Sequence, residues 1–300
     1  MNKNVPIDLP NFSYDYEKYP PIGIDFGTSN SAIAKWVNTI KHTGTRVYTL
    51  NDQVQYLMPS FVYLDSDGEF IAGKGAYNKR IAEPDRVAAC VKRKISDQSK
   101  CIPLADTFFS PIDITAKIIQ AILKSCMDTG LEKPAGIVVS VPYYFTQNQN
   151  NNIRTAVNQA LQQMPQFSCL SVEQRPKLLG LIPEPVAAAL SFSIANMESA
   201  MDDCVLLYDM GGGTLDISIL QLNISGPDIH FEILATDGDD SFGGEDFDHI
   251  LEQYVLENSA ISFKNLDEKL KRRQKRAYSD RYCICKRRFI LCAKNRFVYW

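Results

Sequence analysis

One arrangement occurs twice in this chain and constrains its fold more than any other feature. A short apolar run leads into Asp, one further residue and a glycine turn, and a second apolar run follows. The two copies are Ile24-Asp25-Phe26-Gly27-Thr28 and Tyr208-Asp209-Met210-Gly211-Gly212-Gly213-Thr214. Glycine adopts tight-turn conformations at little steric cost, so each copy predicts two strands joined by a close turn. A unit that recurs in this way indicates two similar lobes.

The apolar pattern around these turns predicts an α/β protein. Strands are expected at 22–26, 31–37, 46–50, 61–64, 70–72, 136–141, 178–182, 205–209, 215–222 and 229–236. Helices are expected at 112–123, at 147–161, from 185 onward and at 245–257. Strands precede helices in both halves, which favours a mixed sheet in each lobe and a ligand cleft between the lobes.

The composition fits a globular protein of about two domains. With 300 residues, 45% of them hydrophobic and 22% charged, the chain can bury a core without disulfides. No apolar run approaches the roughly 18 residues of a membrane span, and the polar, proline-broken start lacks the apolar core of a signal peptide. Eight cysteines without a repeated pair spacing favour reduced thiols, and we therefore expect a cytoplasmic protein.

The end of the chain differs from the rest in charge. From Lys264 to Trp300 there are 13 Lys and Arg against 3 Asp and Glu, whereas the remaining residues carry 19 against 32. A basic run can bind nucleic acid or an acidic membrane surface, but a solvated helix explains such a run more often. We therefore expect neither partner. Cys283, Cys285 and Cys292 lack a fourth ligand nearby, which disfavours a zinc site.

Each glycine turn places a carboxylate at a strand end beside small and hydroxyl residues. Consecutive backbone N–H groups in such a turn can point into one concavity and hold phosphate oxygens. The carboxylate then suits a hydrated Mg²⁺, which keeps most of its waters. Either turn alone is weak evidence, because glycine turns between strands are common and most are ordinary hairpins.

Together and in this order, the segments resemble the nucleotide-binding domain of the 70-kilodalton heat-shock chaperones, the DnaK type. The resemblance covers about residues 21 to 258. Besides the two turns, it is carried by Val139-Ser140-Val141-Pro142-Tyr143-Tyr144-Phe145, by Pro183-Glu184-Pro185-Val186-Ala187-Ala188-Ala189, and by Gly238-Asp239-Asp240-Ser241-Phe242-Gly243-Gly244-Glu245-Asp246-Phe247-Asp248. The last segment separates these chaperones from sugar kinases and actin. The resemblance implies a two-lobed actin-like ATPase fold, which is ribonuclease H-like, with ATP and Mg²⁺ as ligands.

The resemblance also assigns roles to individual positions. Lys92, Glu184 and Asp209 match the catalytic residues, and Asp25, Asp209 and Asp216 match those near the metal. A cation such as Lys92 would stabilise charge on the transferring oxygens. The positions that match nucleotide contacts are Gly27, Thr28, Ser29, Asn30, Gly211, Gly212, Gly213, Thr214, Gly243, Gly244, Glu245, Lys286 and Arg287. A helix begins with Gly243, Gly244 and Glu245, and we expect their backbone N–H groups to cap the nucleotide.

Simpler interpretations exist for two of these residues. Lys92 stands in a basic stretch, where a lysine is usually solvated. Glu184 begins a helix, where the helix dipole favours a carboxylate by about 0.3–1 kcal/mol.

Several positions depart from the family pattern. Asn30 replaces a bulky residue, Asn150 replaces an arginine that relays the nucleotide state, Val186 replaces a threonine, and Cys283 replaces a glutamate. After Arg288 the resemblance ends, before the adenosine loop and the peptide-binding domain of the family. We therefore expect a truncated protein.

These observations predict the following division: 1–20 an extended N-terminal arm, 21–197 lobe I of the ATPase domain, 198–258 a partial lobe II, and 259–300 a basic, divergent helical tail. The function expected is an ATP-binding, chaperone-type ATPase, with co-chaperones or nucleotide-exchange factors as partners. One alternative is a non-catalytic interaction protein that acts as a decoy for those partners. Another is a small-molecule kinase of the same superfamily, which the segment Gly243-Gly244-Glu245-Asp246-Phe247-Asp248 disfavours.

Overall fold

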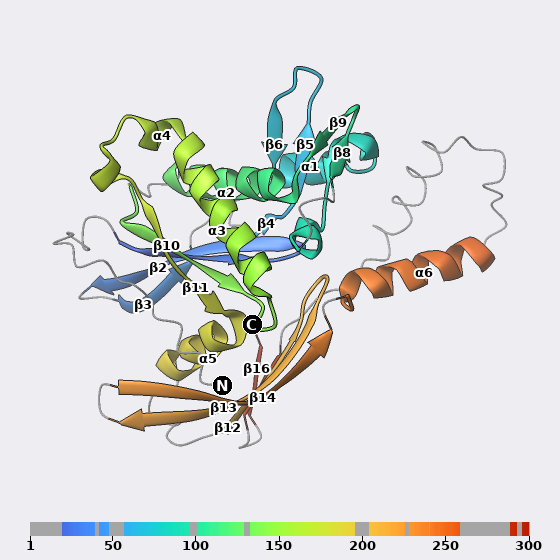
Figure 1. Cartoon of the computed structure of the whole chain (residues 1–300). Coiled ribbons are helices and arrows are strands. Elements are labelled where there is room, and N and C mark those ends of the chain that lie inside the picture. Colours follow the sequence, from blue (N-terminus) through green and yellow to red (C-terminus); the bar gives the residue numbers. More distant parts are fainter. Residues whose placement is uncertain are drawn as a thin grey trace.

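The first glycine turn lies in the central hairpin of a mixed sheet in the computed structural model (Figure 1). The structure describes residues 20–39, 42–47, 57–96, 101–128, 133–195, 204–225, 228–239, 241–258, 289–292 and 296–299. The sheet has the order β11-β10-β1-β2-β3, with β4 paired to β2. Its strands are β1 (Ile22–Phe26), β2 (Asn30–Thr39), β3 (His42–Val47), β4 (Met58–Pro59), β10 (Gly136–Val141) and β11 (Lys177–Pro183). β1 runs antiparallel to β2 and parallel to β10, which is parallel to β11.

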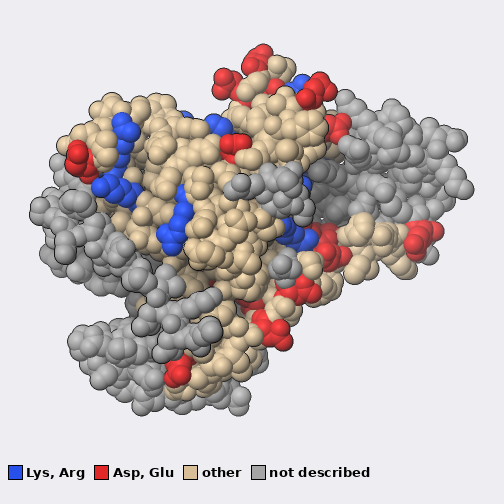
Figure 2. All heavy atoms as spheres, in the orientation of Figure 1, with Lys and Arg blue, Asp and Glu red and all other residues tan. Residues whose placement is uncertain are grey.

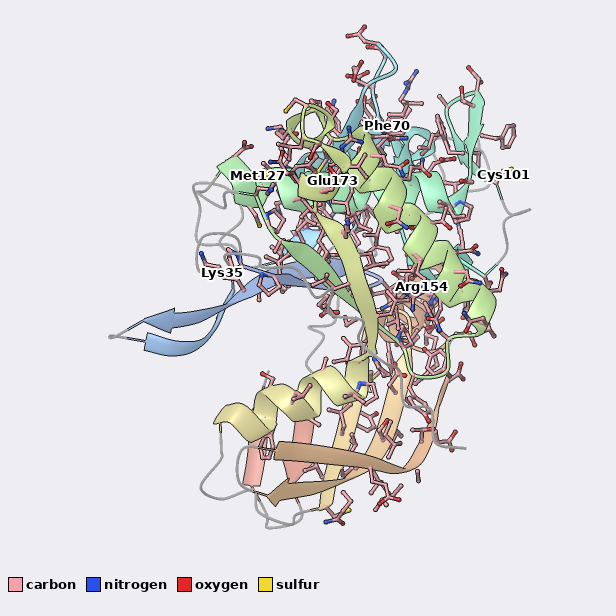
Figure 3. The ribbon with its side chains drawn as sticks, turned by 60° about the vertical axis from the view of Figure 1, so that its left-hand side comes forward. Lys35, Phe70, Cys101, Met127, Arg154 and Glu173 are labelled. Atoms are coloured by element: carbon pink, nitrogen blue, oxygen red, sulfur yellow. The ribbon has the colours of Figure 1, made fainter. Side chains whose placement is uncertain are left out.

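Two amphipathic helices cover one face of this sheet, α2 (Pro111–Asp128) and α3 (Gln147–Gln163). Ile114, Ile118 and Ile122 recur at helical spacing in α2 and are fully buried. Thr146 begins α3 with a capping box, in which its side chain and that of Gln149 satisfy each other's backbone N–H groups. Figure 3 shows the side chains that fill this layer, with Phe70 and Met127 packed at its margin.

A smaller region between β3 and α2 carries short elements. They are β5 (Val62–Leu64), β6 (Phe70–Ala72), α1 (Lys74–Lys79), η1 (Pro84–Arg86), β7 (Val87–Ala88), η2 (Val91–Lys94), β8 (Ile102–Leu104) and β9 (Thr107–Phe109). The predicted turn between β5 and β6 is present: Gly68 has φ +84°, and Asp65 Oδ1 accepts hydrogen bonds from the backbone N–H groups of Asp67 and Glu69. After α3 follow α4 (Pro165–Ser168) and η3 (Val172–Gln174).

The second glycine turn joins two strands of a separate sheet with the order β14-β13-β12-β15-β16. These strands are β12 (Cys204–Met210), β13 (Leu215–Ser225), β14 (Asp228–Asp239), β15 (Phe289–Cys292) and β16 (Arg296–Tyr299). Every neighbouring pair is antiparallel. α5 (Glu184–Ala195) lies between the two sheets, and α6 (Gly244–Asn258) extends away from them (Figure 1).

The structure confirms the α/β class and most of the predicted elements, and it corrects two of them. The strand predicted at 46–50 is β3, which starts at His42, and residues 48–50 lie outside the described part. The tail was expected to be helical and separate, but its described residues form β15 and β16 and belong to the sheet of the second lobe. Backbone hydrogen bonds along β12 provide the reason, because they satisfy an edge that would otherwise stay unpaired. The arm over residues 1–19 lies outside the described residues.

None of the helices in the described part of the chain is both long and apolar enough to cross a membrane.

Candidate functional site

The first loop, between β1 and β2, is a tight turn held by Ser60. A Cβ on Gly27 would lie 2.2 Å from the carbonyl oxygen of Asn30, so only glycine fits. Ser60 Oγ donates to the Gly27 carbonyl at 2.8 Å, and Ser60 N donates to the Ser29 carbonyl at 2.8 Å. Ser60, the residue directly after β4, therefore fixes the path of the loop from a position about thirty residues further along the chain.

The second loop, Gly211 to Thr214, closes on itself because Gly211 N donates to the Thr214 carbonyl at 2.9 Å. Three successive carbonyls of this loop are each held by a donor from outside it. The Gly211, Gly212 and Gly213 carbonyls accept, in that order, from Gly244 N at 3.0 Å, Glu245 N at 2.8 Å and Arg93 Nε at 2.8 Å.

This pattern orients the amides of the second loop. In a trans peptide the C=O and the following N–H point in opposite directions. The N–H groups of Gly212, Gly213 and Thr214 therefore point away from α6 and Arg93. Successive N–H groups turned to one side are the arrangement that binds anions.

The two loops touch each other although they belong to different lobes. A Cβ on Gly213 would lie 2.7 Å from Thr28 Cγ2. A Cβ on Gly243 would lie 2.6 Å from Gly213 N, so the start of α6 packs on the other side of the second loop. Glycine at these two positions permits the close approach of the Thr28 side chain and of the backbone at the start of α6 to the second loop.

Beside the loops lies a buried ion pair. Lys92 Nζ donates to Glu184 Oε1 at 2.5 Å, and the two side chains are only 5% and 7% exposed. Lys92 comes from η2, and Glu184 is the first residue of α5, directly after β11. The Lys92 ammonium also lies 5.9 Å from the Phe26 ring and 6.0 Å from the Phe145 ring. A desolvated pair of this kind holds both groups in defined positions.

Carboxylates gather next to this pair. Asp209 and Asp216 are buried and stand directly opposite each other on β12 and β13. Burial and the nearby charges of Glu184 and Asp209 raise the pKa of Asp216 to about 7. Asp216 Oδ2 has no hydrogen-bond partner among the described residues. On lobe I, Asp25 accepts a hydrogen bond from Ser140 Oγ at 2.9 Å.

The comparisons with known proteins decide the family. The profile of the family described as Hsp70 protein matches residues 97–282. Chaperone protein DnaK from two strains of Halobacterium salinarum is in each case 31% identical over 237 residues, which is 79% of this chain and 33% of the relative. This chain belongs to the Hsp70 family. It corresponds to the nucleotide-binding domain of that family and spans about a third of the length of these relatives. The two-lobed, actin-like fold predicted from the sequence is therefore confirmed.

The structure of this Hsp70-family chain brings many of the predicted residues together. Lys92, Glu184, Asp209 and Asp216 are near enough for their charges to interact. Thr28 meets Gly213, and Gly243 meets Gly212 and Gly213. Asn30 is exposed at the start of β2. Lys286 and Arg287 lie outside the described residues. No three acidic, histidine or cysteine side chains in the described part converge closely enough to hold a bare metal ion.

One expectation for the Hsp70-type site needs correction. The N–H groups of Gly244 and Glu245 donate to the second loop, and Gly243 N donates to Asp246 Oδ2 at 2.7 Å. These three amides are therefore engaged within the protein and do not cap a ligand as predicted. The start of α6 instead acts on the site by holding the carbonyls of the second loop.

The departure at Asn150 also has a structural consequence. This residue lies in the first turn of α3, and its Oδ1 atom is buried with no hydrogen-bond partner among the described residues. An unsatisfied buried oxygen costs about 1–3 kcal/mol. The asparagine thus leaves a polar atom unsatisfied where the family pattern has an arginine.

A cluster of side chains that was not predicted from the sequence joins the lobes. Arg93 Nη2 donates to Asp246 Oδ2 at 2.8 Å, and Arg93 Nη1 lies 3.7 Å from Glu245 Oε2. Cys90 Sγ donates to Glu245 Oε1 at 2.6 Å. Burial acts to lower the pKa of Arg93, but the hydrogen bond to Asp246 and the two carboxylate charges raise it overall. The only sequence signal was a basic stretch, which is typical of solvated residues.

Proposed function

We propose that this chain binds ATP with Mg²⁺ between its two lobes and hydrolyses it, as an ATP hydrolase of the Hsp70 type. One observation carries the proposal: the two glycine loops of different lobes pack against each other beside the buried Lys92–Glu184 pair. A polyphosphate needs amide donors, a cation and carboxylates for its metal in one place. Membership of the Hsp70 family supports the same conclusion.

The carboxylates fit a hydrated magnesium ion. Asp25, Asp209 and Asp216 would hold it through its waters, and the buried, unpartnered Oδ2 of Asp216 is an acceptor suited to such a water. When bound, Mg²⁺ neutralises charge on the phosphate oxygens. A cation near Asp216 would favour the ionised carboxylate and offset the raised pKa.

Roles follow for the remaining residues. The N–H groups of Gly212, Gly213 and Thr214 bind phosphate oxygens from lobe II. The first loop binds them from lobe I, and its members are Gly27, Thr28, Ser29 and Asn30. Lys92 stabilises charge that develops on the transferring oxygens, and Glu184 orients Lys92 and the attacking water. Lys286 and Arg287 contact the adenosine.

The proposed function goes together with a division of the chain into two lobes and with a set of partners. Lobe I comprises residues 21–197, and lobe II comprises residues 198–258 together with β15 and β16. The chain works in protein folding in the cytoplasm, and co-chaperones or nucleotide-exchange factors are its partners. The alternative of a non-catalytic decoy would apply only if nucleotide did not change the unfolding temperature of the chain.

Thermal unfolding with and without Mg-ATP tests nucleotide binding. Binding to the native state adds about 2.7 kcal/mol of stability at one hundred times the Kd. We expect a higher unfolding temperature with Mg-ATP and Mg-ADP, and a loss of the effect in EDTA. Release of phosphate from ATP in the wild-type protein tests hydrolysis. No shift and no release would contradict the proposal, and phosphorylation of a sugar would favour the kinase alternative.

Lys92→Ala separates binding from turnover. A residue that acts on the transition state affects the rate more than the ground-state affinity. We expect single-turnover hydrolysis to fall by about a hundredfold or more, with nucleotide affinity changed by less than about tenfold. An unchanged rate in this variant would remove Lys92 from the mechanism.

A further inference from the structure

The cluster that joins the lobes centres on one guanidinium. Arg93 comes from η2 of lobe I, next to Lys92, and reaches three groups of lobe II. These groups are the Gly213 carbonyl at 2.8 Å, Asp246 Oδ2 at 2.8 Å and Glu245 Oε2 at 3.7 Å. On the face shown in Figure 2, acidic side chains lie at both ends of α6 and on the adjoining end of lobe II, and a basic patch lies next to the start of the helix.

The contact with Gly213 matters most. Gly244 and Glu245 hold the first two carbonyls of the second loop from within lobe II, whereas Arg93 holds the third from lobe I. The Gly213 carbonyl and the Thr214 N–H belong to one peptide plane, so a bond to the carbonyl also sets the direction of the N–H. The last amide of the loop is thus oriented by a residue of the other lobe.

The contacts with α6 add a charge argument. Glu245 and Asp246 lie beside the loop that we assign to phosphate, and uncompensated carboxylates there would repel an anion. Arg93 pairs with both of them. Its planar fork reaches the carbonyl and the carboxylates at once, which a lysine ammonium cannot do in the same geometry.

We propose that Arg93 is a positioning residue that couples the approach of the lobes to the orientation of the second loop. The inference rests on the proposed function, because the oriented amides matter only for a phosphate ligand. Arg93 touches no reacting atom in this scheme. It acts through the Thr214 amide and by neutralising the acidic start of α6.

Arg93→Lys tests the positioning role, since it keeps the charge and removes the fork. We expect kcat to fall by about tenfold while the Kd for Mg-ADP changes by less than about threefold. With saturating Mg-ADP bound, amide hydrogen exchange of residues 212–214 should become faster than in the wild type, because misdirected N–H groups hold the phosphate oxygens less well. Arg86→Lys is the matched control, because Arg86 Nη1 donates to two backbone carbonyls, those of Leu64 and Asp65, away from the site. It should leave kcat unchanged.

The charge role has its own test. Arg93→Ala should weaken Mg-ADP binding by about tenfold or more, because two carboxylates lose their cation. Adding Glu245→Gln and Asp246→Asn to Arg93→Ala should restore the affinity and leave kcat low. A fully structural role for Arg93 would instead change kcat and stability in parallel, with no such rescue.

The outcomes separate this proposal from the proposed function. If the wild type neither binds nor hydrolyses ATP, the proposed function fails and the inference fails with it. If the wild type hydrolyses ATP and Arg93→Lys matches it in kcat and in loop exchange, only the role of Arg93 is overturned.

Discussion

The sheets of the two lobes share a strand order but differ in strand direction. In both sheets the glycine turn joins the first two strands of the lobe into a hairpin. The third strand pairs with the second, and two later strands lie on the side of the first. In lobe I the later strands β10 and β11 are parallel to β1. In lobe II the later strands β15 and β16 form an antiparallel hairpin on β12. The hairpin that carries the loop is therefore the common unit, and different chain segments complete its sheet.

The connections explain the difference. A parallel neighbour requires a crossover, and in lobe I the helices α2 and α3 provide two of them. Only three residues, 293–295, separate β15 from β16, which allows a hairpin but no crossover.

The lobes also differ in their cores. The main hydrophobic cluster of buried residues belongs to lobe I, with Ile22, Ile114 and Phe167 among its members. In the described part of lobe II, the buried hydrophobic side chains are Val205, Leu207 and Leu220. Because buried apolar area supplies most of the stability of a domain, lobe I should be the stable unit and lobe II the dependent one.

Deletion of residues 289–300 is expected to have the largest effect. It removes β15, which pairs with β12, and β16, which pairs with β15, and the described part of lobe II has few buried hydrophobic side chains to compensate. We expect backbone amides of β12 and β13 to lose protection from hydrogen exchange and the response to Mg-ATP to disappear. β1 and β10 should keep their protection. Equal protection of β12 in the full and shortened chains would show that the hairpin is not needed.

Gly243→Ala should have the next largest effect. The new Cβ would lie 2.6 Å from Gly213 N and 2.8 Å from the carbonyl carbon of Gly212, and backbone atoms cannot move aside cheaply. We expect α6 to separate from the second loop and the affinity for Mg-ADP to fall by on the order of a hundredfold. Gly23→Ala in β1 is the control, since nothing lies within 4 Å of its Cβ. Equal affinity of the two variants would contradict this account of the second loop.

Local patterns allowed much of this structure to be predicted. The bounds of β1 and β10 follow from apolar runs between turn residues, and the position of Glu184 follows from the prolines on either side. What was missed depends on distant partners. Arg93 bonds to a carbonyl 120 residues further along, and β15 joins the sheet of lobe II through its pairing with β12, which lies about 80 residues before it. A run of four apolar residues in a basic tail carries no periodicity from which such pairing can be predicted.

The smallest expected effect concerns the residue that stands opposite the aspartate in each glycine-turn hairpin. In lobe I, Asp25 stands opposite Ala32, whereas in lobe II Asp209 stands opposite Asp216. Like charges on directly opposed residues destabilise a sheet, so the carboxylate pair should cost lobe II stability when both are ionised.

The pH dependence has a definite sign. The pKa of Asp216 is about 7 in the folded chain against an ordinary value of 3.8. The folded state therefore binds a proton more tightly than the unfolded state, and stability falls as pH rises from about 4 to about 7. Asp216→Asn keeps a neutral side chain throughout. Without Mg²⁺ it should be more stable than the wild type at pH 8, by on the order of a few kcal/mol, and about equally stable at pH 4.

Urea unfolding in EDTA at the two pH values measures this difference. The same change at Asp25, whose cross-strand neighbour is an alanine, should not stabilise the chain at pH 8. Adding Mg²⁺ should narrow the gap between the wild type and Asp216→Asn, because a bound cation offsets the repulsion between the two carboxylates. Asp216→Asn could also prove less stable than the wild type at pH 8 in EDTA. In that case the opposed carboxylates would not lower the stability of lobe II, and this difference between the two hairpins would be contradicted.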